Sequence, residues 1–179
     1  MAEPRPQVPV LLLVAAFSRH EEALSWGSER LEECYGPIGL VSNPFPFNQT
    51  TYYAATMGMD LRKRFLAFRD LVAPDSLPDI KLHTNALESE LACLQRFPEI
   101  RPLNLDPGHL SLGKFLLATT KDQAHRVYLR DGIFAEVTLR YEAGAFEPWP
   151  WTYADYRQEC VRSFLRDARD YYRERLRES

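Results

Sequence analysis

Two glycines and a lysine stand at the spacing of a phosphate-binding loop in the stretch DPGHLSLGKFLLATTKD, residues 106–122. Gly108 and Gly113-Lys114 match the first seven positions of the pattern G-x-x-x-x-G-K-[ST]. In that motif the backbone N–H groups and the lysine bind phosphates, and the final hydroxyl holds Mg²⁺. The final position here is Phe115, which cannot hold a metal ion, and the intervening residues are mostly bulky and apolar. The sequence therefore argues against a true P-loop.

Polar side chains are nevertheless dense around this lysine, near the ends of predicted strands, where sites tend to be built. If residues 114–119 pair with residues 125–129, then Lys114 or Lys121 converges with His125 and Arg126. Lysine and arginine bind anions, and histidine transfers protons near neutral pH. We therefore predict a phosphate or carboxylate site in which Lys114, Lys121 and Arg126 bind the anion. The alternative is that these residues are ordinary turn, loop and edge-strand residues.

Three further side chains are candidates for acid–base chemistry: Asp106, His125 and Glu136. Glu136 alternates with Phe134 and Thr138 on one face of a predicted strand, and a carboxylate in that position indicates an edge face, a partner cation or a site. Lys114 interrupts an apolar run, so it either extends to solvent or pairs with Asp106 or Glu136.

The predicted helix around residues 80–94 adds two candidate ligand-binding side chains, Asn85 and Glu88. They could hydrogen-bond a ligand if that face lines a pocket, or they could form part of a routine solvent-exposed surface. We predict no metal ligands, since Cys34, Cys93 and Cys160 lack the paired spacing of a zinc site. The residues specify neither a cofactor nor a reaction.

A second hypothesis uses the C-terminal segment. Arginines recur along one face of the last predicted helix, and aromatic residues Trp149, Trp151, Tyr153 and Tyr156 precede it. Such a surface could bind RNA or a protein partner without enzymatic activity. Acidic residues are interleaved with the arginines, which favours a solvated, salt-bridged helix face.

The elements that must position these residues can be predicted from periodicity and turn chemistry. The pattern predicts a buried strand within residues 8–18, a helix from a Ser18 cap to Gly36, the helix around residues 80–94, a hairpin turning at Asp131-Gly132, and a final helix from about Tyr153 to Arg175.

Residues 50–58 and 61–72 resemble two hairpin arms. Periodicity leaves Leu61–Leu71 and Leu110–Thr119 open between strand and helix. Together the elements predict an α+β fold: a two-layer sandwich with a mostly antiparallel sheet, a β-α-β opening and a C-terminal helix.

Composition limits the partners. The chain has 179 residues, a net charge of -3 and 45% hydrophobic residues, which is typical of one domain spanning residues 1–179, with residues 1–7 as a loosely held tail. The acidic balance disfavours DNA and membrane surfaces. Scattered cysteines and an N-terminus without a basic signal-peptide start predict a cytoplasmic protein.

Taken together in this order, several stretches resemble one prokaryotic family known only as a domain of unknown function. They are TYYAATMG, IKLHTNALE, NLDPGHL, KFLLATTKDQAHRVYL, GIFAEVTLRY and PWTYADY. The resemblance extends from about Val8 to Tyr172. It implies no established activity, although some members carry an automatic GTP-binding label. The matching residues that it marks as candidates are Asn85, Glu88, Asn104, Asp106, Lys114, Thr119, Lys121, His125, Arg126, Glu136 and Thr138.

Overall fold

A computed structural model describes residue 3 and residues 7–178 of the chain. The predicted tail, residues 1–7, therefore lies mostly outside the described residues. In chain order the elements are β1 (Leu11–Ser18), α1 (Glu21–Tyr35), β2 (Ile38–Val41), β3 (Phe45–Pro46), α2 (Ala54–Met57), β4 (Arg62–Phe68), the 3₁₀ turn η1 (Pro74–Ser76), α3 (Leu77–Cys93), β5 (Asn104–Leu110), β6 (Lys114–Thr119), β7 (Val127–Arg130), β8 (Ile133–Glu142), β9 (Ala145–Pro148), the 3₁₀ turn η2 (Ala154–Arg157) and α4 (Glu159–Glu178).

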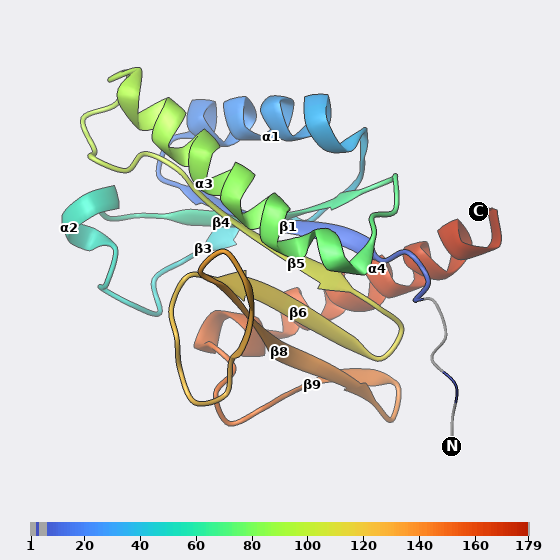
Figure 1. The fold of residues 1–179 in the computed structure, drawn as a ribbon. Helices are drawn as coiled ribbons and strands as arrows, with labels where there is room; N and C mark the ends of the chain where they lie inside the picture. The colour runs from blue at the N-terminus through green and yellow to red at the C-terminus, as the bar shows by residue number, and fades with distance from the viewer. Residues whose placement is uncertain (1–2, 4–6, 179) are drawn as a thin grey trace.

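The strands form one sheet in the order β2-β4-β1-β5-β6-β8-β7, with β3 paired to β4 and β9 paired to β8 (Figure 1). All the described pairings are antiparallel. Because β4 lies between β1 and β2, the first two strands run in the same direction without touching. The predicted β-α-β opening is therefore present, with a third strand inserted into it.

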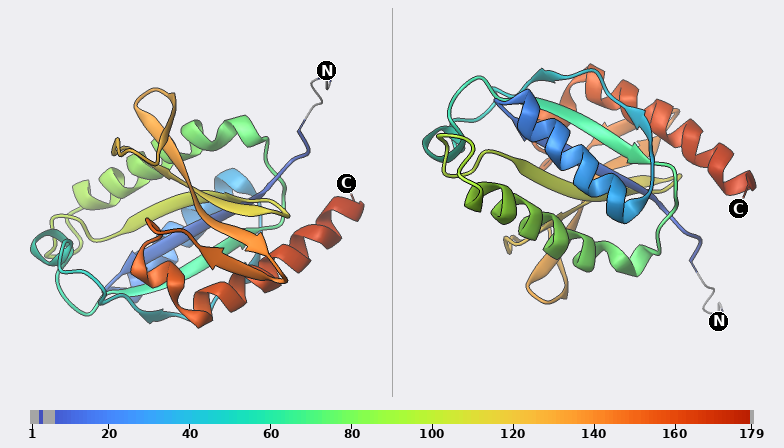
Figure 2. Two further views of the ribbon diagram at one scale, coloured as in Figure 1. Left: turned by 90° about the horizontal axis from the view of Figure 1, so that it is seen from below. Right: turned by 90° about the horizontal axis from the view of Figure 1, so that it is seen from above.

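Strand β1 lies inside the sheet and is buried on both faces. Leu12 and Val14 pack with the apolar faces of α1 and α3, whereas Leu11 and Leu13 pack with α4 on the opposite face. Figure 2 shows the face of the sheet that α4 covers, seen from below, and the face that α1 and α3 cover, seen from above. Each fully buried leucine contributes about 1.5–3 kcal/mol to the stability of the fold relative to an exposed one. Burial of β1 therefore stabilises the packing of helices on both faces of the sheet.

The α+β class, the mostly antiparallel sheet and the C-terminal helix are confirmed. The predicted two-layer sandwich did not place helices on both faces of the sheet. In the structure α1 and α3 cover one face and α4 covers the other. A continuous apolar run such as LLLVAAF has no polar face to leave in water, so it requires cover on both sides.

Several local predictions are also confirmed. The hairpin between β7 and β8 turns at Asp131 and Gly132 with φ angles of 52° and 76°, the two positive values of a type I′ turn. Gly36 ends α1 with a φ of 80°. The two segments left open between strand and helix both form strands. Leu61–Leu71 contains β4, and Leu110–Thr119 contains the end of β5, a turn and β6.

Three local predictions are wrong. Ser18 does not cap α1; it ends β1, where its hydroxyl donates to the Pro102 carbonyl and accepts from the His20 N–H. Residues 50–58 hold the short helix α2 rather than a hairpin arm, because β4 pairs instead with β1 and β2. The last helix begins at Glu159 rather than near Tyr153.

Candidate functional site

The sheet opens between β5 and β6, and this opening forms the candidate site. Within the described part of the chain, these strands pair only through residues 108–110 and 115–117. Before residue 108 on β5 and after residue 117 on β6 the two strands separate. Asn104 and Asp106 on β5 and Thr119 on β6 face the resulting gap, which side chains from other elements enter.

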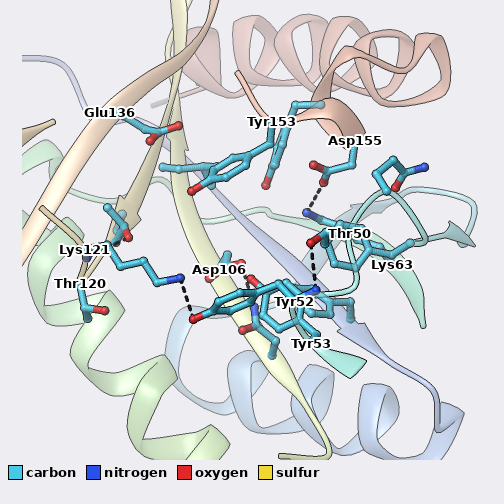
Figure 3. A pocket seen from close by; sticks show the side chains of 18 of the residues that line it. Thr50, Tyr52, Tyr53, Lys63, Asp106, Thr120, Lys121, Glu136, Tyr153 and Asp155 are labelled. Carbon is cyan, nitrogen blue, oxygen red and sulfur yellow. Dashed lines mark hydrogen bonds and ion pairs between the residues drawn. The ribbon is translucent and has the colours of Figure 1, made fainter. Parts of the chain in front are cut away.

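A cavity of about 460 Å³ occupies this opening (Figure 3). Sites for small molecules commonly measure about 300–1,000 Å³. The charged residues that line it are Lys63, Lys81, Arg101, Asp106, Lys121, Arg126, Glu136 and Asp155. The aromatic residues that line it are Phe17, Phe47, Tyr52, Tyr53, Tyr153 and Tyr156.

Asp106 is held at the floor of the gap by a buried lysine. Lys81 Nζ donates to Asp106 Oδ1 at 3.0 Å and to the Leu105 carbonyl at 3.1 Å, while Asn104 Nδ2 donates to Asp106 Oδ2 at 2.8 Å. Burial raises the pKa of Asp106, but Lys81, Lys63 and these hydrogen bonds outweigh it, so the pKa lies below its usual value. Asp106 is therefore a carboxylate at neutral pH.

Glu88 lies behind the cavity wall. Its Oε1 accepts the Leu105 N–H at 2.7 Å, and its Oε2 accepts Arg101 Nη2 at 2.8 Å. Burial raises the pKa of Glu88 above its usual value, although Lys81 and Arg101 lower it. The predicted ligand-binding residue thus fastens α3 to β5 and orients Arg101, which itself faces the cavity.

A buried ion pair joins β4 to the segment before α4. Lys63 Nζ lies 2.6 Å from Asp155 Oδ2, and both side chains are at most 5% exposed. The ammonium also lies 4.4 Å from the ring centroid of Tyr156 and 5.0 Å from that of Phe47. This pair joins β4 to the turn η2, which occupies part of the segment that the sequence pattern assigns to the last helix.

Glu136, Arg126 and His125 lie together, although the sequence suggested Glu136 as a partner for Lys114 and a lysine as the neighbour of His125 and Arg126. Arg126 Nε donates to Glu136 Oε2 at 2.8 Å, and His125 Nε2 lies 3.2 Å from the same oxygen. Arg126 also donates to the Tyr153 hydroxyl at 2.6 Å and to the Lys121 carbonyl at 2.9 Å. Arg126 and Glu136 line the cavity, whereas His125 contacts Glu136 from outside the lining.

Lys121 differs from the other cations of the cavity. Its Nζ lies 3.2 Å from the Tyr52 hydroxyl, across the cavity mouth, and 4.3 Å from the centroid of that ring (Figure 3). Lys63, Lys81, Arg101 and Arg126 each have a carboxylate partner. No carboxylate of the described residues lies within 4.0 Å of Lys121 Nζ.

The structure separates Lys114 from this group. Lys114 begins β6, is exposed and pairs in the sheet with Arg140, at the end of the strand away from the cavity. Asn85 lines the cavity from α3, one helical turn after Lys81. Of the predicted ligand-binding residues, Asn85, Lys121 and Arg126 therefore share the cavity, and their ligand contacts remain predictions.

A family model described as a domain of unknown function, DUF4416, matches residues 8–172 of the chain. The chain belongs to this family. Comparisons with curated proteins and with solved structures gave no match. The family assignment agrees with the resemblance noted in the sequence and supplies no activity.

Sequence reasoning missed several cavity residues: Lys63, Arg101, Tyr52, Tyr53, Tyr153 and Asp155. For Lys63 a signal existed, because the RKRFLAF stretch places it at alternate positions with Phe65 and Ala67, on the buried face of a strand. A lysine on that face requires a buried partner. Asp155 gave no such signal, since it lies 92 positions away in a segment read as a helix.

The C-terminal arginines are largely paired. Arg162 and Arg166 contact Glu159, and Arg173 contacts Asp170. Trp149 and Trp151 stack in parallel at 5.2 Å, between Arg140 on one side and His125 on the other. The proposed RNA or protein surface therefore presents less free positive charge than the arginine spacing suggests.

The described residues contain no cluster of three histidine, cysteine or acidic side chains arranged to hold a metal ion. None of their helices combines the length and the hydropathy needed to span a membrane.

Proposed function

We propose that the cavity binds a small organic anion, either a nucleotide or a phosphorylated metabolite. The observation that carries this proposal is the Lys121 ammonium at the mouth. The other four cations are balanced by carboxylates, so Lys121 supplies the excess positive charge. A charge-assisted hydrogen bond to an anion is about twice as strong as a neutral one.

The neighbours of Lys121 suit a phosphate or carboxylate group. Thr119, Thr120 and Gln123 line the same side of the cavity and carry hydroxyl and amide donors. The Tyr52 hydroxyl holds the lysine in place without neutralising it. An anion at this point would meet one full positive charge and several neutral donors, which favours a monoanionic or dianionic oxygen group.

The aromatic lining suits an organic body attached to that anion. Phe17 packs against Phe47 and Tyr53, with centroid distances of 4.7 and 5.0 Å. A flat or apolar portion of the ligand would lie against these rings, as in most sites for small molecules. A free inorganic ion would leave this surface uncovered.

We assign no reaction to the cavity. Asp106 and Glu136 are its candidate proton acceptors, and both are already engaged by cations. We also propose a cytoplasmic location, because Cys34, Cys93 and Cys160 are exposed free thiols, which a reducing compartment preserves.

A thermal-shift panel of phosphorylated compounds and their unphosphorylated twins tests the proposal. The pairs are AMP and adenosine, GMP and guanosine, and glucose 6-phosphate and glucose, with and without Mg²⁺. A ligand at 100 times its Kd stabilises by about 2.7 kcal/mol, which raises Tm by roughly 5–10 °C in a chain of this size. We expect at least one phosphorylated member to do so and its twin to have little effect. Equal shifts within every pair, or no shift at all, would contradict the proposal.

A further inference from the structure

The Tyr156 hydroxyl is a buried polar group with no hydrogen-bond partner among the described residues. The whole side chain is 2% exposed, and the residue lines the cavity. Proteins leave few buried polar atoms unpaired, and each exception requires an explanation. Other buried hydroxyls set the contrast: Thr152 donates to the Thr138 carbonyl, and Tyr172 donates to the Pro9 carbonyl.

Packing fixes the direction of this hydroxyl. The centroid of the Tyr156 ring lies 5.6 Å from that of Phe65 and 5.9 Å from that of Phe115. The Lys63 ammonium lies 4.4 Å from the Tyr156 centroid. A ring held on several sides cannot turn to reach a partner elsewhere. The phenol oxygen is therefore presented to one fixed place.

The titratable groups that act on this phenol are residues of the cavity. Burial and the neighbouring Asp155, Asp106, Glu136 and Tyr153 together raise the pKa of the Tyr156 phenol well above its usual value. All four neighbours line the cavity. The phenol consequently stays protonated at neutral pH and has one proton to donate.

These carboxylates also determine what the hydroxyl can bind. Asp155, Asp106 and Glu136 are already paired with Lys63, Lys81 and Arg126, so among the described residues this part of the cavity offers no unpaired cation to an anion, whereas a neutral acceptor suits the phenol O–H. The Tyr156 hydroxyl is buried, whereas Lys121 is exposed at the cavity mouth, so the two groups lie at different depths of the cavity. The anionic group and the group that meets Tyr156 therefore belong to different parts of one ligand.

We propose that Tyr156 is a specificity-determining residue that donates a hydrogen bond to a neutral carbonyl oxygen of the ligand. This inference rests on the proposed function and narrows it: the ligand is an organic anion whose carbonyl lies away from its phosphate or carboxylate group. The anionic group lies at Lys121, and the body between the two groups packs against the aromatic lining. A ligand of the same shape without the carbonyl leaves the phenol unpaired and binds more weakly.

A matched pair of probes tests this assignment by calorimetry. 4-Acetylphenyl phosphate and 4-ethylphenyl phosphate have nearly the same shape, and only the first carries a carbonyl. We expect the wild type to bind the acetyl compound about tenfold more tightly than the ethyl compound. The Tyr156→Phe variant should bind both with similar affinity, because it keeps the ring and lacks the donor.

Two controls separate this result from a change in the fold. Without ligand, Tyr156→Phe should be at least as stable as the wild type, since the hydroxyl has no protein partner to lose. Tyr172→Phe loses a bond to a backbone carbonyl, so its Tm should fall while the tenfold preference for the acetyl probe is kept.

The outcomes distinguish the inference from the function on which it rests. If both probes bind the wild type equally, or if Tyr156→Phe keeps the preference, the role of Tyr156 is overturned and the anion site stands. If neither probe binds, the proposed anion site itself is contradicted.

Discussion

The buried lysine and aspartate that join β4 to η2 illustrate how single residues determine this site. Lys63 and Asp155 are both nearly inaccessible to solvent, and the desolvation of two charges offsets most of their attraction. Removing one partner from such a pair commonly costs about 3–5 kcal/mol, since the other charge stays buried. The pair is therefore better understood as a constraint on geometry, which places Tyr156 in the cavity wall, than as a source of stability.

A different buried residue, His109, gives the chain a predictable response to acid. Its ring is 2% exposed, its Nε2 has no partner among the described residues, and burial lowers its pKa from 6.5 to about 4. The unfolded chain binds this proton from pH 6.5 downward, whereas the folded chain resists it until about pH 4. His109 therefore makes the folded state less stable as the pH falls through that window.

We expect this residue to account for roughly 3 kcal/mol of the loss in unfolding free energy between pH 7 and pH 4. Urea unfolding of the wild type and of His109→Met at several pH values measures it. As the pH falls from 7 to 4, the wild type should lose roughly 3 kcal/mol more unfolding free energy than His109→Met does. Parallel curves would show that His109 is protonated as readily in the folded chain as in the unfolded one.

At the scale of elements, the contact between β5 and β6 explains the glycines that resembled a phosphate loop. A Cβ at Gly108 would overlap the backbone carbonyl oxygen of Leu116 and the ring of Phe115. A Cβ at Gly113 would meet no atom within 4 Å. Gly108 is thus needed for a close approach of two strands, and Gly113 occupies an open turn.

The two glycines make a matched experiment. Gly108→Ala should lower the free energy of unfolding by at least about 2 kcal/mol, because neither the Leu116 backbone nor the buried Phe115 ring can move away cheaply. Gly113→Ala should change it by less than about 0.5 kcal/mol. Chemical denaturation of both variants measures this difference, and similar values for the two would contradict the strand contact described here.

The sequence predicted those elements whose signals are local. The apolar run of β1, the glycine that ends α1 and the Asp131-Gly132 turn each identify one element without reference to the rest of the chain. It did not predict α2, because the aromatic and β-branched TTYY stretch is typical of strands and only the partners of β4 exclude it.

The same difference between local signals and distant pairings applies to the residues of the site. Glu136 was considered as a partner for Lys114, whereas in the structure it pairs with Arg126, ten positions away. Lys114 was favoured over Lys121 because it interrupts an apolar run, but the side chain lies at the far end of β6 from the cavity. Tyr52 and Lys121 are 69 positions apart, and no local pattern could pair them.

At the scale of the whole molecule, the cavity is built where distant parts of the chain meet. The loop before α2, the N-terminal part of α3, the loop after β6 and the turn η2 all contribute side chains to one opening in the sheet. Ion pairs and hydrogen bonds satisfy the carboxylates and four of the cations. The Lys121 ammonium at the mouth has no carboxylate partner among the described residues, so it is the charge that a bound anion would balance.

Lys114, which begins β6, and Lys121, which follows the strand, provide the most direct test of the anion site at the cavity. Lys121 lines the cavity, and Lys114 is an exposed lysine at the opposite end of the same strand. Isothermal titration of the wild type, Lys121→Met and Lys114→Met should use the phosphorylated compound that stabilises the wild type most. The account predicts at least a tenfold loss of affinity for Lys121→Met and an unchanged Kd for Lys114→Met. Equal affinities for all three proteins, or a loss confined to Lys114→Met, would contradict an anion site at this cavity.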